Sequence, residues 1–423
     1  MNLSEKDKKF IWHPFTPQKN GGNEIVIEKA EGSYYYDSHG KKYIDAISSW
    51  WVNLHGHSHP YIAKKIAEQA STMEHIMFSG FTHAPAIHLA EKLLNHLPSN
   101  QSKIFFSDNG STAVEVAIKM ALQFWNNRGE EKPLFIALEN AYHGDTFGGM
   151  SVGERNVFNQ AFEKLLFNVV HIPLPTKNNI TELESEMETL VKNHPVAGFI
   201  FEPLVQGAAG MLMYESEFLD RLLNVCKKNK VITIADEVMT GFGRTGKFFA
   251  SDYLENKPDI ICMSKGLTGG FMPLGATSCA GFIHEAFISE DKEKTFFHGH
   301  SYTANPLACS AALASMELME DPKTFNQINM ISESHLAFSD KVKSNKAVKN
   351  IRVKGTILAI ELKTDEETHY LNSAAQMITD FFLNKGILLR PLGNVFYLIP
   401  PYCISKDDMQ VIYAAIEEFL VTR

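Results

Sequence analysis

Two charged side chains stand where short apolar runs end. Asp236 follows Val231–Ala235, and Lys265 comes one residue after Ile260–Met263. A charge at the end of a buried strand is costly unless it has a partner. Burial lowers the pKa of a lysine, whose neutral amine can attack an aldehyde, while an aspartate can hold a protonated pyridine nitrogen. Taken alone, Lys265 could be a surface lysine, and Asp236 a helix cap or half of an ion pair.

A turn rich in glycine and hydroxyl groups follows a third apolar run. The stretch Asp108-Asn109-Gly110-Ser111-Thr112 comes after Ile104–Ser107 and opens a helical pattern. The free N–H groups of a helix N-terminus suit a phosphate, and a glycine lets the backbone approach it closely. The alternative is a helix cap without a ligand. The turn is neither a Walker loop nor a G-x-G-x-x-G, which argues against nucleoside triphosphates and NAD.

A fourth apolar run, Leu134–Leu138, leads to the aromatic turn Tyr142-His143-Gly144. An aromatic ring beside a glycine can stack on a flat ligand, although a packed loop tyrosine is the structural alternative. The order along the chain carries more weight than any single element. A phosphate cradle, an aromatic turn, Asp236 and then Lys265 together predict a site for pyridoxal 5'-phosphate (PLP), with Lys265 as its Schiff-base lysine.

These apolar runs are separated by amphipathic stretches such as Thr112–Trp125 and Glu217–Lys228. The alternation predicts an α/β domain around a mostly parallel, buried sheet. Ligands bind beyond the carboxyl ends of the strands in such sheets, which is where the candidate residues fall. For a chain of 423 residues we expect a large domain, residues 56–324, and a small α+β domain from both chain ends, residues 1–55 and 325–423.

The amino-terminal part of the chain has patterns of its own. Alternation in Glu24–Ala30 and Tyr34–Tyr43 predicts short antiparallel strands around the turn Asp37-Ser38-His39-Gly40. Residues 61–97 show helical periodicity, with breaks expected at Gly80 and Pro85.

Composition narrows the function further. The formal net charge of −9 disfavours nucleic acids and anionic membranes, because both attract clustered Lys and Arg. No apolar run approaches the roughly 20 residues of a membrane span, and the first residues lack the apolar core of a signal peptide. The five cysteines are scattered and never spaced C-x-x-C, which argues against a disulfide framework or a zinc site. We expect a cytoplasmic location.

Two arginines are candidates for binding a substrate carboxylate. Arg244 lies in the Gly-rich loop Gly241–Gly246, and Arg390 precedes a proline. The planar guanidinium pairs with a carboxylate through two parallel hydrogen bonds. For either arginine the alternative is a structural role or a surface ion pair.

His55, His57 and His59 alternate, but no cysteine or carboxylate stands at ligand spacing beside them, so we expect no metal site. The adjacent Trp50 and Trp51 cannot both point into one core from a strand. We expect one to line a pocket; the alternative is one buried ring and one at an interface.

The stretch Ala235–Gly246, together with Ser264-Lys265-Gly266, resembles the class III (omega) aminotransferases of PLP fold type I. The matching positions run from about Trp12 to Tyr402, which is nearly the whole chain. The resemblance implies an α/β fold, with a large central mixed or parallel sheet and a small α+β domain, and PLP-dependent amino transfer. It also implies a homodimer whose active sites lie at the subunit interface.

The resemblance also implies roles for single residues. Lys265 holds the cofactor and moves the proton, Asp236 pairs with the pyridine nitrogen, and Tyr142 packs over the ring. The phosphate is held by Gly110 and Ser111, with His300 and Ser301 of the partner subunit. The substrate site comprises Phe15, Trp50, Tyr142, Lys265, Gly299 and Arg390, with Arg390 facing the carboxylate and with Glu202 and Arg244 in support.

Further stretches narrow the substrate. His13-Pro14-Phe15-Thr16, Ser48-Ser49-Trp50-Trp51 and Phe297–Tyr302 resemble class III members that convert 8-amino-7-oxononanoate to 7,8-diaminononanoate in biotin synthesis. The resemblance implies S-adenosylmethionine as amino donor, which Trp50 favours. Phe15 stands where many users of this donor have a tyrosine, and His300 where some have a proline. Lysine is therefore an alternative donor.

Other reactions stay open at this point. The chain could be another omega-aminotransferase, acting on ornithine or 4-aminobutyrate, or a PLP aminomutase that needs no added donor. A binding protein without catalysis is disfavoured, because Lys265 and Asp236 are both present. An assay for donor dependence separates an aminotransferase from an aminomutase.

Overall fold

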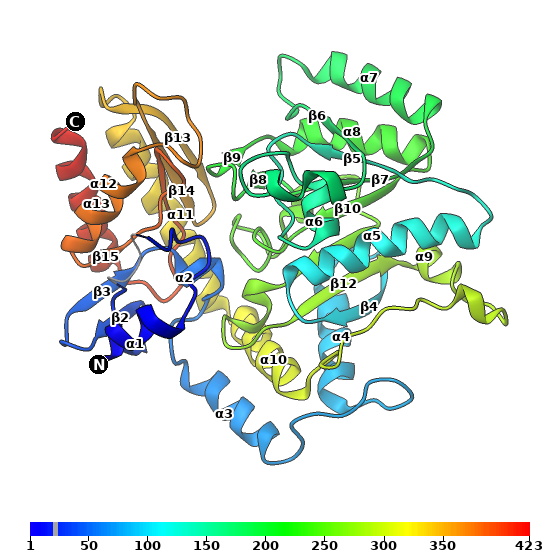
Figure 1. The fold of residues 1–423 in the computed structure, drawn as a ribbon, viewed down its shortest axis with the longest axis horizontal. Coiled ribbons are helices and arrows are strands. Elements are labelled where there is room, and N and C mark those ends of the chain that lie inside the picture. The colour runs from blue at the N-terminus through cyan, green and yellow to red at the C-terminus, as the bar shows by residue number, and fades with distance from the viewer. Residues whose placement is uncertain (20–23) are drawn as a thin grey trace.

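The computed structural model describes residues 1–19 and 24–423, and its centre is a seven-stranded sheet in the order β4-β12-β11-β10-β7-β5-β6 (Figure 1). β12 runs antiparallel to both of its neighbours, and the other pairs are parallel. In sheet order the strands are β4 (Gln101–Ser107), β12 (Gly275–Ala280), β11 (Ile260–Met263), β10 (Ile232–Asp236), β7 (Val196–Phe201), β5 (Leu134–Leu138) and β6 (Val169–Ile172). The predicted mixed, mostly parallel sheet is confirmed.

Helices cover both faces of this sheet, which explains the uninterrupted apolar sequence of its middle strands. Along β7, Phe199 belongs to one apolar cluster and Ile200 to the other, because successive side chains point to opposite faces. On the Ile200 face, α5 (Gly110–Asn127) packs against β4, β11 and β12. On the Phe199 face lie α4 (Ala84–His96) and α8 (Ser216–Lys228), with α7 (Ile180–Asn193) beside α8.

The remaining elements of this part of the chain are short or lie at its edge. α10 (Pro306–Glu320) packs against α3 (Pro60–Ala70) and α4. The others are α6 (Phe147–Val152), α9 (Gly281–Glu285), the strand pair β8 (Val205–Gln206) and β9 (Leu212–Met213), and the 3-10 turns η1 (Gln160–Leu165), η2 (Ala250–Tyr253), η3 (Lys265–Thr268) and η4 (Lys292–Lys294).

The two ends of the chain share a sheet, as the blue and orange segments at the left of Figure 1 show. β15 (Ile387–Leu388) pairs in parallel with β3 (Lys42–Asp45). On the other side of β3 the sheet contains β2 (Tyr34–Asp37) and then β1 (Ile27–Glu31). A second sheet contains β13 (Val348–Lys354), β14 (Ile357–Leu362) and β16 (Val395–Leu398), accompanied by α11 (Pro322–Val342), α12 (Ala374–Asn384) and α13 (Lys406–Val421). This pairing supports the proposed small domain; its exact limits remain a proposal.

Of two local sequence predictions, one is corrected in part and the other, the antiparallel strands of Tyr34–Tyr43, is confirmed. As predicted, the helical pattern of residues 61–97 is broken at Gly80, which lies between α3 and α4, but Pro85 lies in the first turn of α4 rather than at a break. Proline is tolerated there because the first N–H groups of a helix have no partner within the helix. The alternating stretch Tyr34–Tyr43 is a hairpin, since the Asp37 carboxylate accepts hydrogen bonds from two backbone N–H groups and turns the chain.

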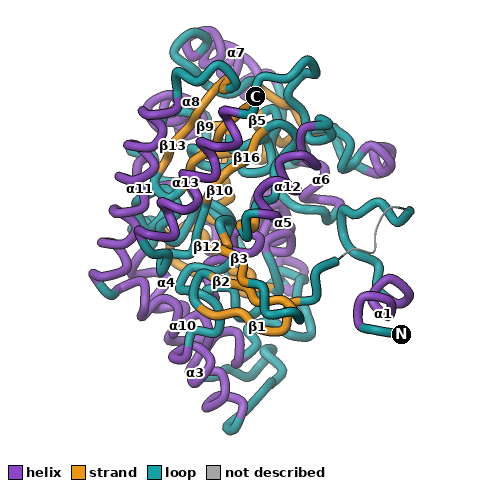
Figure 2. The backbone as a smooth tube through the Cα atoms, turned by 90° about the vertical axis from the view of Figure 1, so that its left-hand side faces the viewer, coloured by secondary structure: helices purple, strands orange, loops and turns teal. Residues whose placement is uncertain are grey.

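The amino-terminal helix α1 (Leu3–Phe10) lies at the edge of the molecule and buries none of its residues (Figure 2). Among the residues that the structure describes, no helix combines the length and the apolar character needed to cross a bilayer.

Candidate active site

Lys265 lies where β11 ends and the turn η3 begins. Its φ of 45° is in the left-handed region, an unfavourable conformation that non-glycine residues adopt most often at functional sites. Nζ lies 4.9 Å from the centre of the Trp51 ring. Burial lowers the pKa of Lys265, although the nearby carboxylates of Asp236 and Glu202 oppose the shift. A lowered pKa increases the fraction of neutral amine, the form that attacks a carbonyl.

Asp236 ends the neighbouring strand β10 and is held by the aromatic turn. Its Oδ2 lies 2.7 Å from Nδ1 of His143, and its Oδ1 accepts a hydrogen bond from the N–H of Val238 at 3.1 Å. Both side chains of the Asp236–His143 pair are buried. Each carboxylate oxygen can accept a further hydrogen bond, so His143 orients Asp236 without using up its acceptors.

Glu202 follows β7 and fixes the backbone of the aromatic turn. Its carboxylate accepts hydrogen bonds from the N–H of Tyr142 at 3.1 Å and from that of Gly207 at 2.9 Å. Burial raises the pKa of Glu202 to about 7, and the charge of Asp236 adds to the shift. Glu202 is therefore a group whose protonation changes near neutral pH.

The phosphate cradle predicted from the sequence is the start of α5. Asn109 caps this helix, its Oδ1 accepting a hydrogen bond from the N–H of Thr112 at 3.0 Å. Gly144, with φ +104°, lies directly over the helix start, where a Cβ would collide with the side chain of Ser111. Free N–H groups, a helix dipole and a hydroxyl therefore meet at one point, which suits an anion.

These groups line one cavity of about 620 Å³, here called the inner cavity. Its walls include the predicted cofactor residues Gly110, Ser111, Tyr142, Asp236 and Lys265. His143, Glu202 and Val238 also line it.

A second cavity of about 320 Å³, here called the outer cavity, holds the predicted substrate residues Phe15, Trp50 and Arg390. The guanidinium carbon of Arg390 lies 3.9 Å from the centre of the Trp50 ring and 5.6 Å from that of Phe15. Trp51, Val52, Tyr142, Asp145 and Lys265 line both cavities. The two cavities therefore meet at Lys265.

The short, kinked helix α2 (Ser48–Trp51), here called the tryptophan loop, has an unusual backbone. Ser48, Ser49 and Trp51 have φ values of 53°, 62° and 67°. The buried carboxylate of Asp45 accepts hydrogen bonds from the N–H of Ser49 at 2.7 Å and of Ile47 at 3.1 Å. Trp50 lines the outer cavity, while the buried Trp51 lines both cavities.

Arg244 is buried and lines neither cavity. Its guanidinium donates hydrogen bonds to the backbone carbonyls of Pro400, Asn53 and Trp51 at 3.0, 3.1 and 3.3 Å. Arg244 therefore fastens the tryptophan loop to the carboxyl-terminal segment. The structure favours the structural alternative for Arg244 over binding of a substrate carboxylate.

Gly299, His300 and Ser301 lie on the segment that leads to α10 and line neither cavity of their own chain. Nδ1 of His300 is 3.4 Å from a carboxylate oxygen of Asp108, and Ser301 is exposed. Their roles in cofactor and substrate binding remain predictions.

Two of the alternating histidines, His55 and His57, contact neighbouring side chains of the protein. Nε2 of His57 lies 2.9 Å from Oδ2 of Asp45, and Nε2 of His55 lies 3.1 Å from Oγ of Ser315. Burial lowers the pKa of His55 to about 3, so its ring is neutral. These contacts support the segment that follows Trp50 and Trp51 in the chain.

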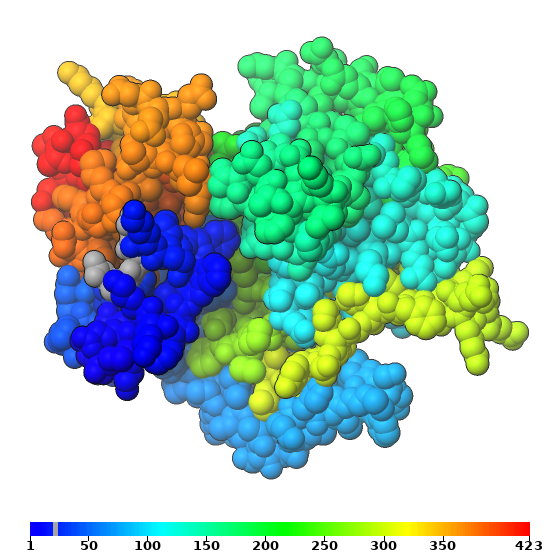
Figure 3. All heavy atoms as spheres, in the orientation of Figure 1, coloured from blue at the N-terminus to red at the C-terminus, as the bar shows by residue number. Residues whose placement is uncertain are grey.

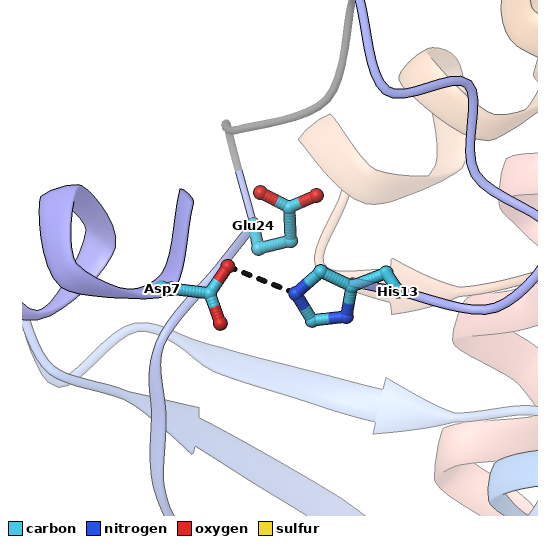
Figure 4. A group of neighbouring side chains, drawn as sticks. All are labelled: Asp7, His13 and Glu24. Atoms are coloured by element: carbon cyan, nitrogen blue, oxygen red, sulfur yellow. Dashed lines mark hydrogen bonds and ion pairs between the residues drawn. The ribbon is translucent and has the colours of Figure 1, made fainter. Parts of the chain in front are cut away.

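Figure 4 shows a group of potential metal ligands elsewhere, Asp7, His13 and Glu24, whose ligand atoms lie within 4.8 Å of one another. Nε2 of His13 is 2.8 Å from Oδ2 of Asp7, and this hydrogen bond raises the pKa of His13. The Asp7–His13 pair ties α1 to the segment that leads to Phe15.

Sequence reasoning did not assign several residues of the outer cavity, among them Asp145, Phe158 and Tyr370. Asp145 stands just after the aromatic turn and could have been found by its distance from the strand end. Phe158 and Tyr370 lie in loops that follow no strand of the large sheet. No residue pattern in the sequence marks them.

The family pattern described as Aminotransferase class-III matches residues 16–420, and the chain belongs to this family, as its motifs predicted. Over 418 residues the chain is 46% identical to the adenosylmethionine-8-amino-7-oxononanoate aminotransferase of Synechococcus elongatus, covering 97% of this chain and 98% of the relative.

Solved structures agree with this assignment. A crystal structure of the adenosylmethionine-8-amino-7-oxononanoate aminotransferase of Methanocaldococcus jannaschii superimposes with a TM-score of 0.93 at 40% identity, covering 98% of each chain. An amine transaminase from an uncultivated Pseudomonas species, solved in its PLP-bound form, has a TM-score of 0.89 at 30% identity, covering 96% of this chain and 97% of that one.

Proposed function

We propose that this chain is a PLP-dependent aminotransferase that converts 8-amino-7-oxononanoate to 7,8-diaminononanoate, a step of biotin synthesis, with S-adenosylmethionine as amino donor. The observation that carries the proposal is the meeting of two cavities at Lys265, one suited to a phosphorylated ring and one to a carboxylate. The activity printed for relatives at 46% and 40% identity supports the choice of substrate.

The residues of the inner cavity fit PLP. The start of α5, with Gly110 and Ser111, offers N–H groups and a hydroxyl to the phosphate. Asp236, held by His143, offers a carboxylate to the pyridine nitrogen. Tyr142 and Val238 supply walls for a flat ring.

Bound PLP supplies an electron sink for bond breaking at the substrate carbon. The Lys265 Nζ takes the proton from that carbon and returns it, which its lowered pKa allows. The carboxylate of Asp236 keeps the pyridine nitrogen protonated. Burial raises the pKa of Tyr142, so its hydroxyl stays neutral and able to donate a hydrogen bond.

Arg390 is the proposed partner of the substrate carboxylate. Its guanidinium is stacked on Trp50 and lines the outer cavity, while the reacting amine of Lys265 lies where the cavities meet. A long keto acid can therefore reach from Arg390 to Lys265. The pairing of guanidinium and carboxylate is a charge-assisted, two-point contact.

We also propose a homodimer, in which His300 and Ser301 complete the phosphate site of the partner subunit. Two neighbouring segments, residues 73–83 and 296–303, here called the apolar ridge, expose Met77, Phe81, Phe297 and Tyr302. The segments touch, since the rings of His75 and Tyr302 are 5.1 Å apart. The part leading to α10 runs along the surface in Figure 3. An exposed apolar patch of this kind marks an interface. The proposed location is the cytoplasm.

The test is a half-reaction. The purified PLP form is mixed with S-adenosylmethionine or with lysine, without acceptor, and the absorbance of the bound cofactor is followed. We expect S-adenosylmethionine to convert the cofactor to its amine form, and 8-amino-7-oxononanoate to reverse the change. Conversion by lysine instead would assign the alternative donor. Reversal by an ornithine- or 4-aminobutyrate-derived aldehyde, but not by 8-amino-7-oxononanoate, would reject the proposed substrate.

Lys265→Ala is the matching variant. It should fold and bind PLP without covalent attachment, because the α5 cradle and Asp236 remain, yet it should lose turnover by several orders of magnitude. Borohydride reduction followed by peptide mapping checks the attachment. Substantial turnover of the variant at saturating substrates would refute the role of Lys265.

A further inference from the structure

The rings of Phe158 and Tyr370 pack against each other in one wall of the outer cavity. Their centroids are 4.6 Å apart, with an interplanar angle of 66°, and both side chains line the cavity. Phe158 also makes edge contacts with Phe15 and Tyr142, at 6.0 and 6.3 Å between centroids. Edge-to-face contacts at these distances are favourable. The two rings therefore form part of one wall of the cavity, although they are more than two hundred positions apart in the chain.

The turn that carries Phe158 is held by side-chain hydrogen bonds. Oδ1 of Asn156 accepts the N–H of Phe158 at 2.9 Å, and Oδ1 of Asn159 accepts the N–H of Asn156 at 3.1 Å. Nδ2 of Asn159 donates to the carbonyl of Glu154 at 2.7 Å. The backbone that carries the Phe158 ring is therefore held by contacts within its own turn.

The loop that carries Tyr370 is anchored in the same way. Oγ1 of Thr368 donates to the carboxylate of Glu361 at 2.7 Å and accepts from Nδ2 of Asn394 at 3.2 Å. Nδ2 of Asn372 donates to the carbonyl of Glu367 at 3.0 Å. Two separately anchored loops thus present two rings to one cavity, an arrangement that selects for the shape of a ligand.

Charge indicates which substrate this wall contacts. Asp145 lines both cavities, so it lies where they meet, whereas Arg390, Phe158 and Tyr370 line the outer cavity alone. The outer end therefore pairs one cation with apolar rings. That chemistry matches an apolar chain ending in a carboxylate. It disfavours the sulfonium of S-adenosylmethionine, because like charges repel strongly in a partly buried site.

We propose that Phe158 and Tyr370 are specificity-determining residues that pack against the methylene chain of the keto-acid acceptor. The inference rests on the proposed function, because it names that acceptor. The two rings fill the stretch of wall between the carbon that reacts near Lys265 and the carboxylate held by Arg390. Binding of the donor does not depend on them.

The experiment measures the two half-reactions separately in Phe158→Ala, Tyr370→Ala and Tyr370→Phe. Phe162→Ala is the matched control, since Phe162 is an exposed ring nearby that lines neither cavity. We expect the alanine variants to raise the concentration of 8-amino-7-oxononanoate needed for half-maximal rate by about tenfold or more. The donor half-reaction should stay within about twofold of wild type. Phe162→Ala should behave like wild type, and Tyr370→Phe, which keeps the ring, should raise the half-maximal acceptor concentration less than Tyr370→Ala does.

Each other outcome overturns the inference. Equal losses in both half-reactions would show that the rings support the site as a whole, and a loss confined to the donor would assign the wall to the sulfonium. Unchanged acceptor dependence would show that the rings make no contact. The wild-type enzyme is measured first: if it fails to aminate 8-amino-7-oxononanoate, the proposed function itself fails, and this inference with it. Thermal unfolding checks that each variant is folded.

Discussion

Among single residues, Glu202 gives the clearest reason to expect that the free energy of unfolding depends on pH. Burial raises its pKa to about 7 from an ordinary value of 4.5, so between these pH values the folded protein retains a proton that the unfolded chain has released. The free energy of unfolding must then fall as pH rises through this window. The stabilisation that the proton on Glu202 provides is complete below pH 4.5 and lost above pH 7.

Glu202→Gln removes this titration while keeping the shape of the side chain. In protein freed of cofactor, the wild type should lose on the order of 3 kcal/mol more stability than the variant between pH 5 and pH 8. Urea unfolding at several pH values measures the difference. Parallel stability curves for the two proteins would contradict the raised pKa of Glu202.

Residues at strand ends were predictable, because a charge after a buried strand is conspicuous in a sequence. Lys265 and Asp236 were found in this way, and both line the inner cavity. Phe158 and Tyr370 were not, since an aromatic side chain in a loop has no distinctive neighbours in sequence. His143 stood within a recognised turn, but its contact with Asp236 depends on tertiary packing.

At the scale of elements, the cradle depends on how closely the aromatic turn approaches α5. Gly144 has φ +104°, and a Cβ there would collide with Ser111. We expect Gly144→Ala to weaken PLP binding by roughly ten- to a hundredfold, because the turn must move away from the helix start. Fluorescence titration of the cofactor-free protein with PLP measures the change.

Gly129→Ala is the control for this prediction. Gly129 has φ +76°, and nothing lies within 4 Å of an added Cβ, so it introduces backbone strain without a collision. An equal effect of both substitutions on PLP binding would contradict the role of the close approach.

The buried strands and their helices were predictable from apolar runs, because a parallel sheet covered on both faces leaves an unmistakable pattern. The tryptophan loop was not. Ser48, Ser49 and Trp51 have left-handed backbones, and Asp45 supports this turn through the N–H groups of Ile47 and Ser49. No glycine in this stretch indicates such a backbone in the sequence. Pro85 was misread as a break, because proline starts helices as readily as it ends them.

At the scale of the molecule, the apolar ridge should hold two subunits together. A double variant, Phe81→Asp with Phe297→Asp, should shift the protein toward monomers, because it places charges in an apolar interface. It should also weaken retention of PLP, since the proposed phosphate site includes His300 and Ser301 of the partner subunit. Sedimentation velocity and cofactor absorbance measure the two effects.

Val411→Asp is the control, since Val411 is also an exposed apolar residue and lies on α13, away from the apolar ridge. It should leave both the assembly and the cofactor content unchanged. A double variant that stays dimeric would place the interface elsewhere.

The meeting of the two cavities at Lys265 has a kinetic consequence. One chamber must admit donor and acceptor in turn, so each substrate can occupy the form of the enzyme that is waiting for the other. Excess acceptor then acts as a competitive inhibitor of donor entry, and excess donor delays the acceptor. When both substrates are in excess, flux through the enzyme therefore depends on the ratio of their concentrations, and it is greatest at a balance set by their relative affinities for the shared chamber.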